Sequence, residues 1–234
     1  MPNATIVLTE GVVGLAAAQD VGLVVDLLPE RALFIRAARA LVVADLHVGK
    51  SESYRRFGVP STDGIDEESL IRLSRAAMRA EAKVIVVVGD LTHSAEGIGE
   101  AERERFNEFR QRCSLPIRLV EGNHDRGART LPPEWMIDRV GETFELAGIR
   151  FCHDPSEVSA SAKWTICGHL HPMLSVSRGV RSVEAPAFVV ERKKRVVVLP
   201  AFSKFTRGVR VEPTIDREVH AIVESTVIGP LGGV

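Results

Sequence analysis

Short apolar runs that end in polar clusters recur along this chain, and they constrain its fold more than any other feature. Their length and β-branched residues predict strands, and near-continuous apolar strands are expected inside a sheet that is covered on both faces. The six predicted strands span residues 41–44, 84–88, 117–120, 149–152, 164–167 and 196–199. We therefore expect a fold built on a buried sheet.

Two segments between the early strands have helical spacing. Residues 66–82 begin with acidic side chains suited to a first helical turn and carry an apolar face, and residues 100–113 place aromatic side chains at helical intervals. Strands that alternate with helices predict right-handed crossovers and parallel pairing. Residues 188–192 and 195–199 predict a hairpin around two lysines. The chain is expected to be α/β first and β-rich afterwards.

Overall charge gives no reason to expect a nucleic-acid-binding module. The chain has 30 Lys and Arg against 31 Asp and Glu, a formal net charge of −1. A nucleic-acid substrate would therefore have to be held locally. Aromatic residues are only 5% of the chain, Tyr54 is the only tyrosine, and no basic stripe with interleaved aromatics is seen. Plain binding through charge is disfavoured.

The cysteines bear on the cellular compartment. Cys113, Cys152 and Cys167 are odd in number and share no CxxC spacing, which predicts buried thiols in a reducing, cytoplasmic environment. Neither a signal peptide nor a membrane-spanning run is expected. The length suits a single domain over residues 1–234.

Residue types that bind metals follow five of the predicted strands, at the carboxyl ends where open α/β sheets place ligands. The clusters are Asp45-Leu46-His47, Gly89-Asp90, Gly122-Asn123-His124-Asp125, His153-Asp154 and Gly168-His169-Leu170-His171. Five of the seven histidines lie in these clusters, His93 lies three residues after Asp90, and only His220 stands apart. Histidines that served only core packing would be dispersed, each satisfying its own nitrogens locally. The pattern favours a metal centre at one edge of the sheet.

Together and in this order, the clusters make residues 41–172 resemble the calcineurin-like metallophosphoesterase superfamily. That resemblance implies a four-layer α/β/β/α sandwich and an enzyme that hydrolyses phosphodiesters by in-line attack of a hydroxide that bridges two metal ions. Carried over by position, one ion would be held by Asp45, His47, Asp90 and His171, and the other by Asp90, Asn123, His153 and His169. The set lacks a thiolate, which disfavours a structural zinc and suits manganese, iron, zinc or cobalt. Manganese is favoured by the resemblance.

The resemblance makes His124 the group that protonates the leaving oxygen or stabilises the negative charge that develops on it, and Asp125 could orient it. The alternative is a structural histidine beside the metal ligands. Gly89, Gly122 and Gly168 adjoin predicted ligands and would allow close approach of the backbone, although ordinary strand-end turns explain them equally well.

Several side chains near the metal motifs could bind phosphate. We predict that they lie in loops and that Arg126 is the best candidate, although a solvated charged face explains each one singly. They are Lys50, Arg55, Arg56, Arg126 and Arg129. His93 could face the substrate, and a role in the turn is an equal alternative.

A narrower resemblance rests on residues 28–32, 44–50 and 199–202, which are similar to the ligase-associated DNA damage response endonucleases, the PdeM group. It implies a DNA repair nuclease with helicase, ligase or exonuclease partners. A small nucleotide or cyclic nucleotide phosphodiesterase remains the main alternative, and a noncatalytic scaffold of this fold is another. A serine/threonine phosphatase is disfavoured because Val48 and Asp125 stand where that class has Gly and Glu.

Overall fold

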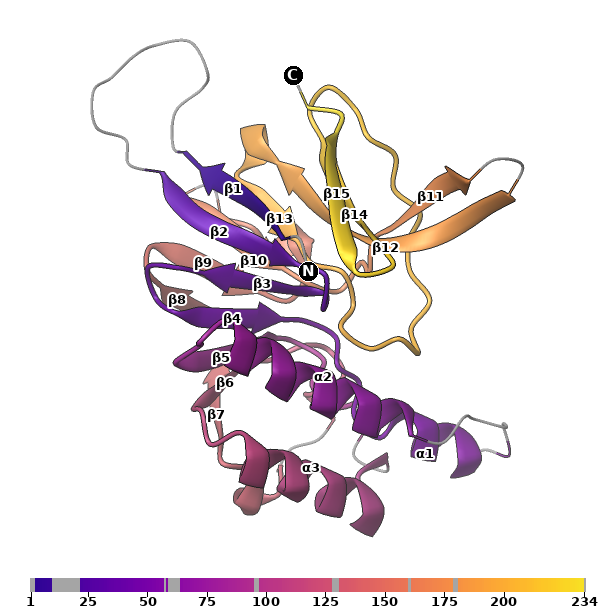
Figure 1. The fold of residues 1–234 in the computed structure, drawn as a ribbon. Coiled ribbons are helices and arrows are strands. Elements are labelled where there is room, and N and C mark those ends of the chain that lie inside the picture. The colour runs from indigo at the N-terminus through magenta and orange to yellow at the C-terminus, as the bar shows by residue number, and fades with distance from the viewer. Residues whose placement is uncertain are drawn as a thin grey trace.

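Two β-sheets form the centre of the molecule (Figure 1). The computed structural model describes residues 3–9, 22–56, 58, 64–94, 97–127, 131–159, 161–178 and 181–233. The first sheet has seven strands in chain order: β1 (Ala4–Leu8), β2 (Leu23–Leu28), β3 (Ala32–Ile35), β4 (Ala40–Val43), β5 (Val84–Val88), β6 (Ile117–Val120) and β7 (Ile137–Gly141). Strands β1 to β4 pair antiparallel, and β4 to β7 pair parallel. The predicted parallel pairing is confirmed.

The second sheet has eight strands and is mixed. Its order is β15-β14-β12-β13-β10-β9-β8, and β11 pairs with β12. The strands are β8 (Thr143–Leu146), β9 (Ile149–Cys152), β10 (Trp164–Cys167), β11 (Met173–Arg178), β12 (Arg181–Glu191), β13 (Val196–Val198), β14 (Glu218–Val223) and β15 (Thr226–Leu231). The predicted hairpin is β12 and β13, joined through one 3-10 turn at Arg192–Lys194. Strands β9 and β10 run parallel, so their carboxyl ends meet at one edge.

Helices cover the outer face of the first sheet. They are α2 (Ile65–Arg79) and α3 (Glu100–Arg112), and a third helix, α1 (Lys50–Arg56), lies against α2. Side chains such as Leu73 of α2 and Phe106 of α3 pack on Leu41 and Ile85 of the sheet. The opposite face of this sheet packs against the second sheet, so both faces of the central strands are buried, which explains their near-continuous apolar sequences.

The fourth layer of the expected sandwich is not seen in the part of the chain that the structure describes. The outer face of the second sheet carries a small apolar cluster that includes Leu174 of β11 and Val211 instead of an α-helix. The physical reason lies in the connections. Among its described residues, the link from β9 to β10 holds only a 3-10 turn at Pro155–Glu157, and the chain beyond β10 enters the β11–β12 arm. A further 3-10 turn, Pro133–Trp135, precedes β7.

Helix α1 corrects one prediction. Lys50, Arg55 and Arg56 were expected in loops, and they lie in this helix instead. The sequence did not predict this helix because it has no apolar face: its buried residues are Ser51 and Ser53. The three cysteines are buried and free, as predicted. No helix among the described residues is both long and apolar enough to cross a membrane.

Candidate metal centre

Both sheets contribute side chains to one cluster at the carboxyl ends of their parallel strands. Asp45 and Asp90 follow β4 and β5 of the first sheet, and His153, His169 and His171 follow β9 and β10 of the second. The two carboxylates are buried, with 0% and 3% exposure. Two buried carboxylates are costly unless cations or hydrogen-bond donors compensate for their charge.

Two overlapping groups of side chains have the spacing that a metal ion requires. Asp45, His47 and His171 form one, and Asp45, Asp90 and His153 form the other, with the donor atoms of each group within 4.8 Å of one another. In the first group His171 Nε2 lies 3.1 Å from Asp45 Oδ1. In the second, His153 Nε2 lies 3.3 Å from Asp90 Oδ2 and 3.9 Å from Asp45 Oδ1.

The remaining two predicted ligands adjoin these groups. His169 Nδ1 lies 3.2 Å from His153 Nε2, and the backbone N–H of His169 donates to Asp45. Asn123 is exposed in the turn after β6. The backbone N–H of the next residue, His124, donates to Asp90 Oδ1 at 3.0 Å, which ties this turn to the cluster.

Backbone carbonyls orient three of the imidazoles in the same way. His153 Nδ1 donates to the Val88 carbonyl at 3.1 Å, and His171 Nδ1 donates to the Arg207 carbonyl at 2.9 Å. His124 Nδ1 donates to a third carbonyl, that of His93, at 2.7 Å. A carbonyl only accepts, so each Nδ1 carries the proton and each Nε2 is left for the cluster. Metal-binding histidines are held in this manner.

His47 provides the clearest test of whether a metal fits. Its side chain is 2% exposed, and neither ring nitrogen has a hydrogen-bond partner among the described residues. Burial holds the pKa of His47 far below its usual range, to about 2, against the opposing pull of Asp90. The ring is therefore neutral and can donate a lone pair. A buried imidazole without partners is expensive, and a cation would satisfy it.

His153 and Asp90 form an ion pair that a cation can replace. Burial alone would lower the pKa of His153, but its hydrogen bond to Asp90 and the charge of Asp45 raise it to about 9. Burial would raise the pKa of Asp90, but the hydrogen bond and charge of His153 lower it to about 2. A divalent ion would take the place of the shared proton, so metal binding at this pair releases a proton.

The predicted ligands share an unusual backbone conformation. Five of them have positive φ, between +47° and +69°. They are Asp45, His47, Asp90, His169 and His171. Left-handed backbone at a residue with a side chain costs roughly 1–2 kcal/mol and persists only where surrounding contacts impose it. Such strain concentrates at functional sites.

The three glycines beside these ligands are required by close packing. A Cβ at Gly89 would lie 2.0 Å from His153 Nδ1, and one at Gly122 would lie 2.3 Å from Asp90 Oδ1. A Cβ at Gly168 would lie 2.8 Å from Asp45 Oδ2. Of the two interpretations that the sequence left open, close approach of the backbone to the ligands is the one observed.

Asp125 does not orient His124 as the sequence suggested. Its buried carboxylate accepts hydrogen bonds from the N–H groups of Leu91, Thr92 and Gly122, and from the Thr92 hydroxyl. Asp125 thus joins the turns after β5 and β6. The His93 carbonyl orients His124 instead, and His124 Nε2 lies 3.9 Å from Asp90 Oδ2.

The predicted phosphate-binding residues divide into those near the cluster and those away from it. The His93 ring stacks on that of His124 with centroids 4.9 Å apart, and the imidazoles of His47, His93 and His124 form a third close group. Burial lowers the pKa of Lys50, and the charges of Asp90 and Asp45 oppose that shift.

The predicted arginines form ion pairs with glutamates or lie outside the described residues. Arg126 pairs with Glu142 at 2.9 Å. Arg55 and Arg56 pair with Glu52 on the exposed side of α1, and Arg129 lies outside the described residues.

The two outer sequence motifs contact each other behind the cluster, which sequence reasoning did not anticipate. Arg31 Nη1 donates to the carbonyls of Ala201 and Ser203 at 3.2 and 2.8 Å. The N–H of Ser203 donates to the Asp45 carbonyl at 3.1 Å. Arg31 therefore holds the segment that contains Ser203, and this segment in turn is bonded to the backbone of the predicted ligand Asp45.

Comparison with known families agrees with this geometry. The model of the calcineurin-like phosphoesterases matches residues 38–156, just over half of the 234 residues. The chain therefore belongs to this family of hydrolytic phosphoesterases. His169 and His171 lie beyond the matched residues.

Two solved structures are similar to this chain, to different degrees. The nuclease MPE of Pseudomonas putida is 29% identical, with 89% of this chain and 97% of that chain covered and a TM-score of 0.73. The phosphoesterase YfcE of E. coli is 16% identical, with 82% and 98% covered, and its TM-score of 0.42 is too low to carry an argument. No curated protein matches.

Proposed function

We propose that this chain is a nuclease that cleaves phosphodiester bonds in DNA with two divalent cations, manganese being favoured. The observation that carries the proposal is the convergence of imidazole Nε2 atoms on two buried carboxylates, Asp45 and Asp90. The likeness to a nuclease of known structure supports DNA as the substrate. A role in DNA repair, with helicase, ligase or exonuclease partners, is supported by the narrower sequence resemblance alone.

The residues that would hold the cations are those predicted from the strand ends. Asp45, His47, Asp90 and His171 would hold one, and Asp90, Asn123, His153 and His169 the other. Two such cations lower the pKa of water and neutralise negative charge on a phosphodiester. The strained backbone and the crowded glycines preorganise these side chains, so little reorganisation is needed when substrate binds.

His124 is the proton donor in this proposal. The His93 carbonyl fixes Nδ1 as a donor and leaves Nε2 on the side of Asp90. In the imidazolium form, His124 transfers the Nε2 proton to the leaving oxygen. Lys50 would hold a nonbridging phosphate oxygen. Asp125 keeps the turns after β5 and β6 together. Three buried free thiols support a reducing, cytoplasmic setting.

The test is hydrolysis by chelator-treated protein, with manganese restored, of bis-nitrophenyl phosphate, nitrophenyl phosphate and labelled single-stranded DNA. We expect metal-dependent cleavage of the diester and the DNA, and none by the Asp90→Ala protein. Cleavage of the diester without DNA would indicate a small nucleotide or cyclic nucleotide phosphodiesterase. No turnover with two ions bound would indicate a noncatalytic scaffold.

A further inference from the structure

We propose that Tyr54 and Phe205 form a stacking platform for an unpaired base of single-stranded DNA whose phosphate lies at the candidate metal centre. The inference rests on the proposed nuclease function and extends it, because it assigns recognition of the base to two side chains. The ring centroids of Tyr54 and Phe205 are 5.4 Å apart, and their planes are inclined by 63°. In this edge-to-face arrangement one ring leaves its faces uncovered by the other.

The platform adjoins the metal centre directly. The Tyr54 ring lies 6.0 Å from that of His93, and the His93 ring lies 5.5 Å from that of His47. A row of rings therefore leads from Phe205 to a predicted ligand. A nucleotide whose phosphate reached the metal centre would extend its base along this row.

Neither ring takes part in the hydrophobic core. Both are partly exposed and belong to none of the three apolar clusters, whereas Phe106, Phe151 and Phe202 are buried. Partly exposed aromatic side chains that adjoin a candidate metal centre and lie outside the apolar core are candidates for ligand binding.

The segments that carry the two rings are fixed to the predicted ligands. Helix α1 starts after His47, whose carbonyl accepts from the Lys50 N–H at 3.1 Å. Phe205 follows Ser203, whose N–H donates to Asp45 and whose hydroxyl accepts from the Phe205 N–H at 3.1 Å. The platform is thus held at a defined distance from the metal centre.

The cationic side chain of Lys50 lies beside both rings of the platform. Lys50 Nζ lies 5.9 Å from the centroids of both rings. No ion pair is seen for Lys50 among the residues that the structure describes, so its charge is available to a phosphate. Aromatic faces beside a positive charge are the pattern by which proteins bind single strands, because every base has a π-face. A base within a duplex is already stacked, so the platform selects unpaired DNA.

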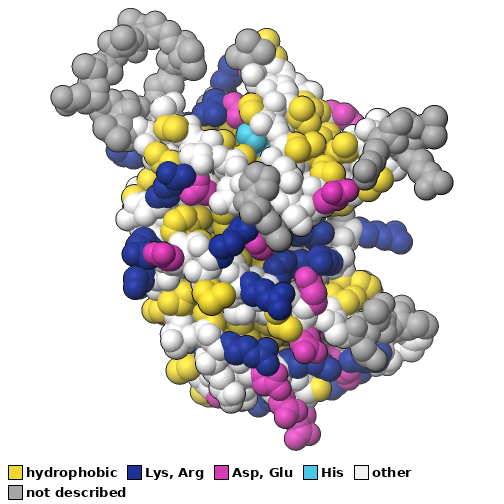
Figure 2. Space-filling view, in the orientation of Figure 1, with side chains coloured by type: hydrophobic (Ala, Val, Ile, Leu, Met, Phe, Trp, Pro, Cys, Tyr) yellow, Lys and Arg dark blue, Asp and Glu magenta, His cyan; other side chains and the backbone are white. Residues whose placement is uncertain are grey.

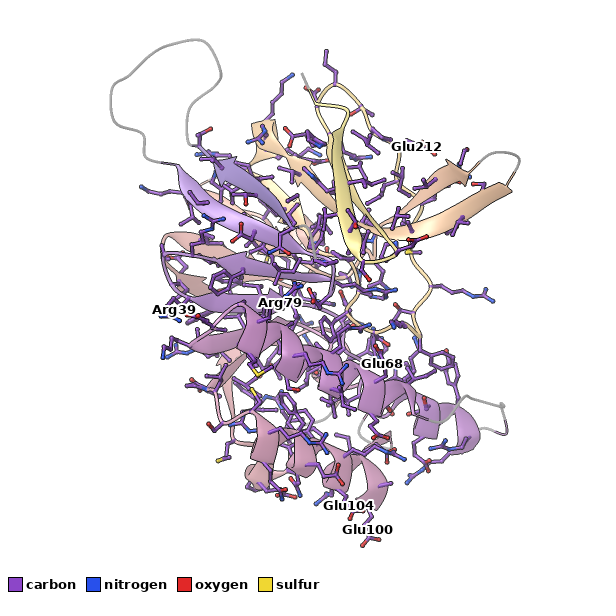
Figure 3. All side chains as sticks on the ribbon, viewed as in Figure 1. Arg39, Glu68, Arg79, Glu100, Glu104 and Glu212 are labelled. Carbon is purple, nitrogen blue, oxygen red and sulfur yellow. The ribbon has the colours of Figure 1, made fainter. Side chains whose placement is uncertain are left out.

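Other basic surfaces suit DNA less well. Lys and Arg side chains gather across the middle of the face in Figure 2. Arg31, Arg72 and Lys204 line a cleft of ≈ 620 Å³. Acidic partners offset these charges. Glu68, labelled on α2 in Figure 3, lies 3.0 Å from Lys204 and 3.3 Å from Arg72. Arg31 is already bonded to backbone carbonyls.

The test compares a substrate that has a base with one that lacks it. We would measure kcat and KM for thymidine 5′-(4-nitrophenyl phosphate), its 3′ isomer and methyl 4-nitrophenyl phosphate. Wild-type protein should prefer one nucleoside diester, and Tyr54→Ala and Phe205→Ala should each reduce that preference about 5- to 150-fold, since a stacked base contributes roughly 1–3 kcal/mol. Turnover of the methyl diester and bound metal should change less than about twofold, which is within the scatter of neutral surface changes.

Two further variants separate stacking from packing. Tyr54→Phe keeps a planar ring and should keep the preference, whereas Tyr54→Leu fills the space without a face and should lose it. An equal loss on all three substrates, or an unchanged preference in both alanine variants, would overturn the platform.

Binding without turnover separates this inference from the function on which it rests. Anisotropy of a labelled oligothymidylate would be measured in a His124→Ala background, with and without Tyr54→Ala. If the wild-type protein cleaves no DNA and binding still depends on Tyr54, the nuclease proposal fails and the platform stands. If the wild-type protein cleaves DNA and binding does not depend on Tyr54, the nuclease proposal stands and the platform fails.

Discussion

Gly89 offers a sharp test of how the metal centre is built. It has a φ of +76°, and a Cβ there would lie 2.0 Å from Nδ1 and 2.3 Å from Cγ of His153. Gly89→Ala should therefore incur about 1–2 kcal/mol of backbone strain and, because the ring must move, about 1–3 kcal/mol more from overpacking. The displaced ring would lose its 3.3 Å contact with Asp90.

Gly148→Ala is the matched control. Gly148 has a φ of +77°, and the nearest atom to its added Cβ is the flexible Lys163 Cδ at 3.9 Å. It should incur the same backbone strain and no crowding. Thermal unfolding should show the difference, since 1 kcal/mol shifts the midpoint by about 2–4 °C in a protein of this size.

The functional readout is metal affinity measured by calorimetry together with diester hydrolysis. We expect Gly89→Ala to lose about 10- to 100-fold in metal affinity or activity, the usual effect of disturbing the support of a ligand, and Gly148→Ala to retain both. If the two variants are equally destabilised and both retain metal affinity, the packing of Gly89 against His153 does not hold the centre together.

Three other predictions concern single side chains. Asp90→Ala should lose bound metal and all hydrolysis, because Asp90 would hold both ions; metal analysis that still finds two ions would contradict its bridging role. His124→Ala should retain metal and lose about 10²- to 10⁴-fold in turnover of poor leaving groups, with a smaller loss for nitrophenolate; equal losses on both substrates would argue against proton donation. Burial raises the pKa of Asp66 to about 6 from 3.8. Stability should therefore fall as the pH rises from 3.8 to 6, by up to about 3 kcal/mol. Asp66→Asn, which can still accept from the Gly49 N–H, should be more stable than wild type at pH 7.5 but not at pH 3.5. Urea unfolding at both pH values checks this, and an equal gain at both would exclude titration as the cause.

The ligands could be proposed from the sequence because each lies within four residues of the end of a strand. Parallel pairing then brings the carboxyl ends of β4 and β5 together, and likewise those of β9 and β10. Strand β2 was not predicted because Asp26 interrupts its apolar run. That charge is tolerated because Arg36 donates two hydrogen bonds to it, both 2.7 Å long.

Features that depend on distant segments could not be predicted. The carbonyl that orients His171 belongs to Arg207, and the ring beside Tyr54 belongs to Phe205. No local pattern connects these positions, because His171 and Arg207 are 36 residues apart in the chain and Tyr54 and Phe205 are still further apart. The orientation of His124 by the His93 carbonyl, in place of Asp125, depends on the pairing of β5 with β6, which brings the turns after these strands together.

The division of the predicted ligands between two sheets has a consequence for folding. Asp45 and Asp90 are synthesised first, but the set is complete only after β10 has formed and docked, and His169 and His171 lie beyond the residues that match the family. An ion bound by these residues would link the two sheets and favour the state in which both are folded. Bound metal should make the two sheets unfold together in a single cooperative transition. Retention of the metal would then indicate that both sheets are correctly folded.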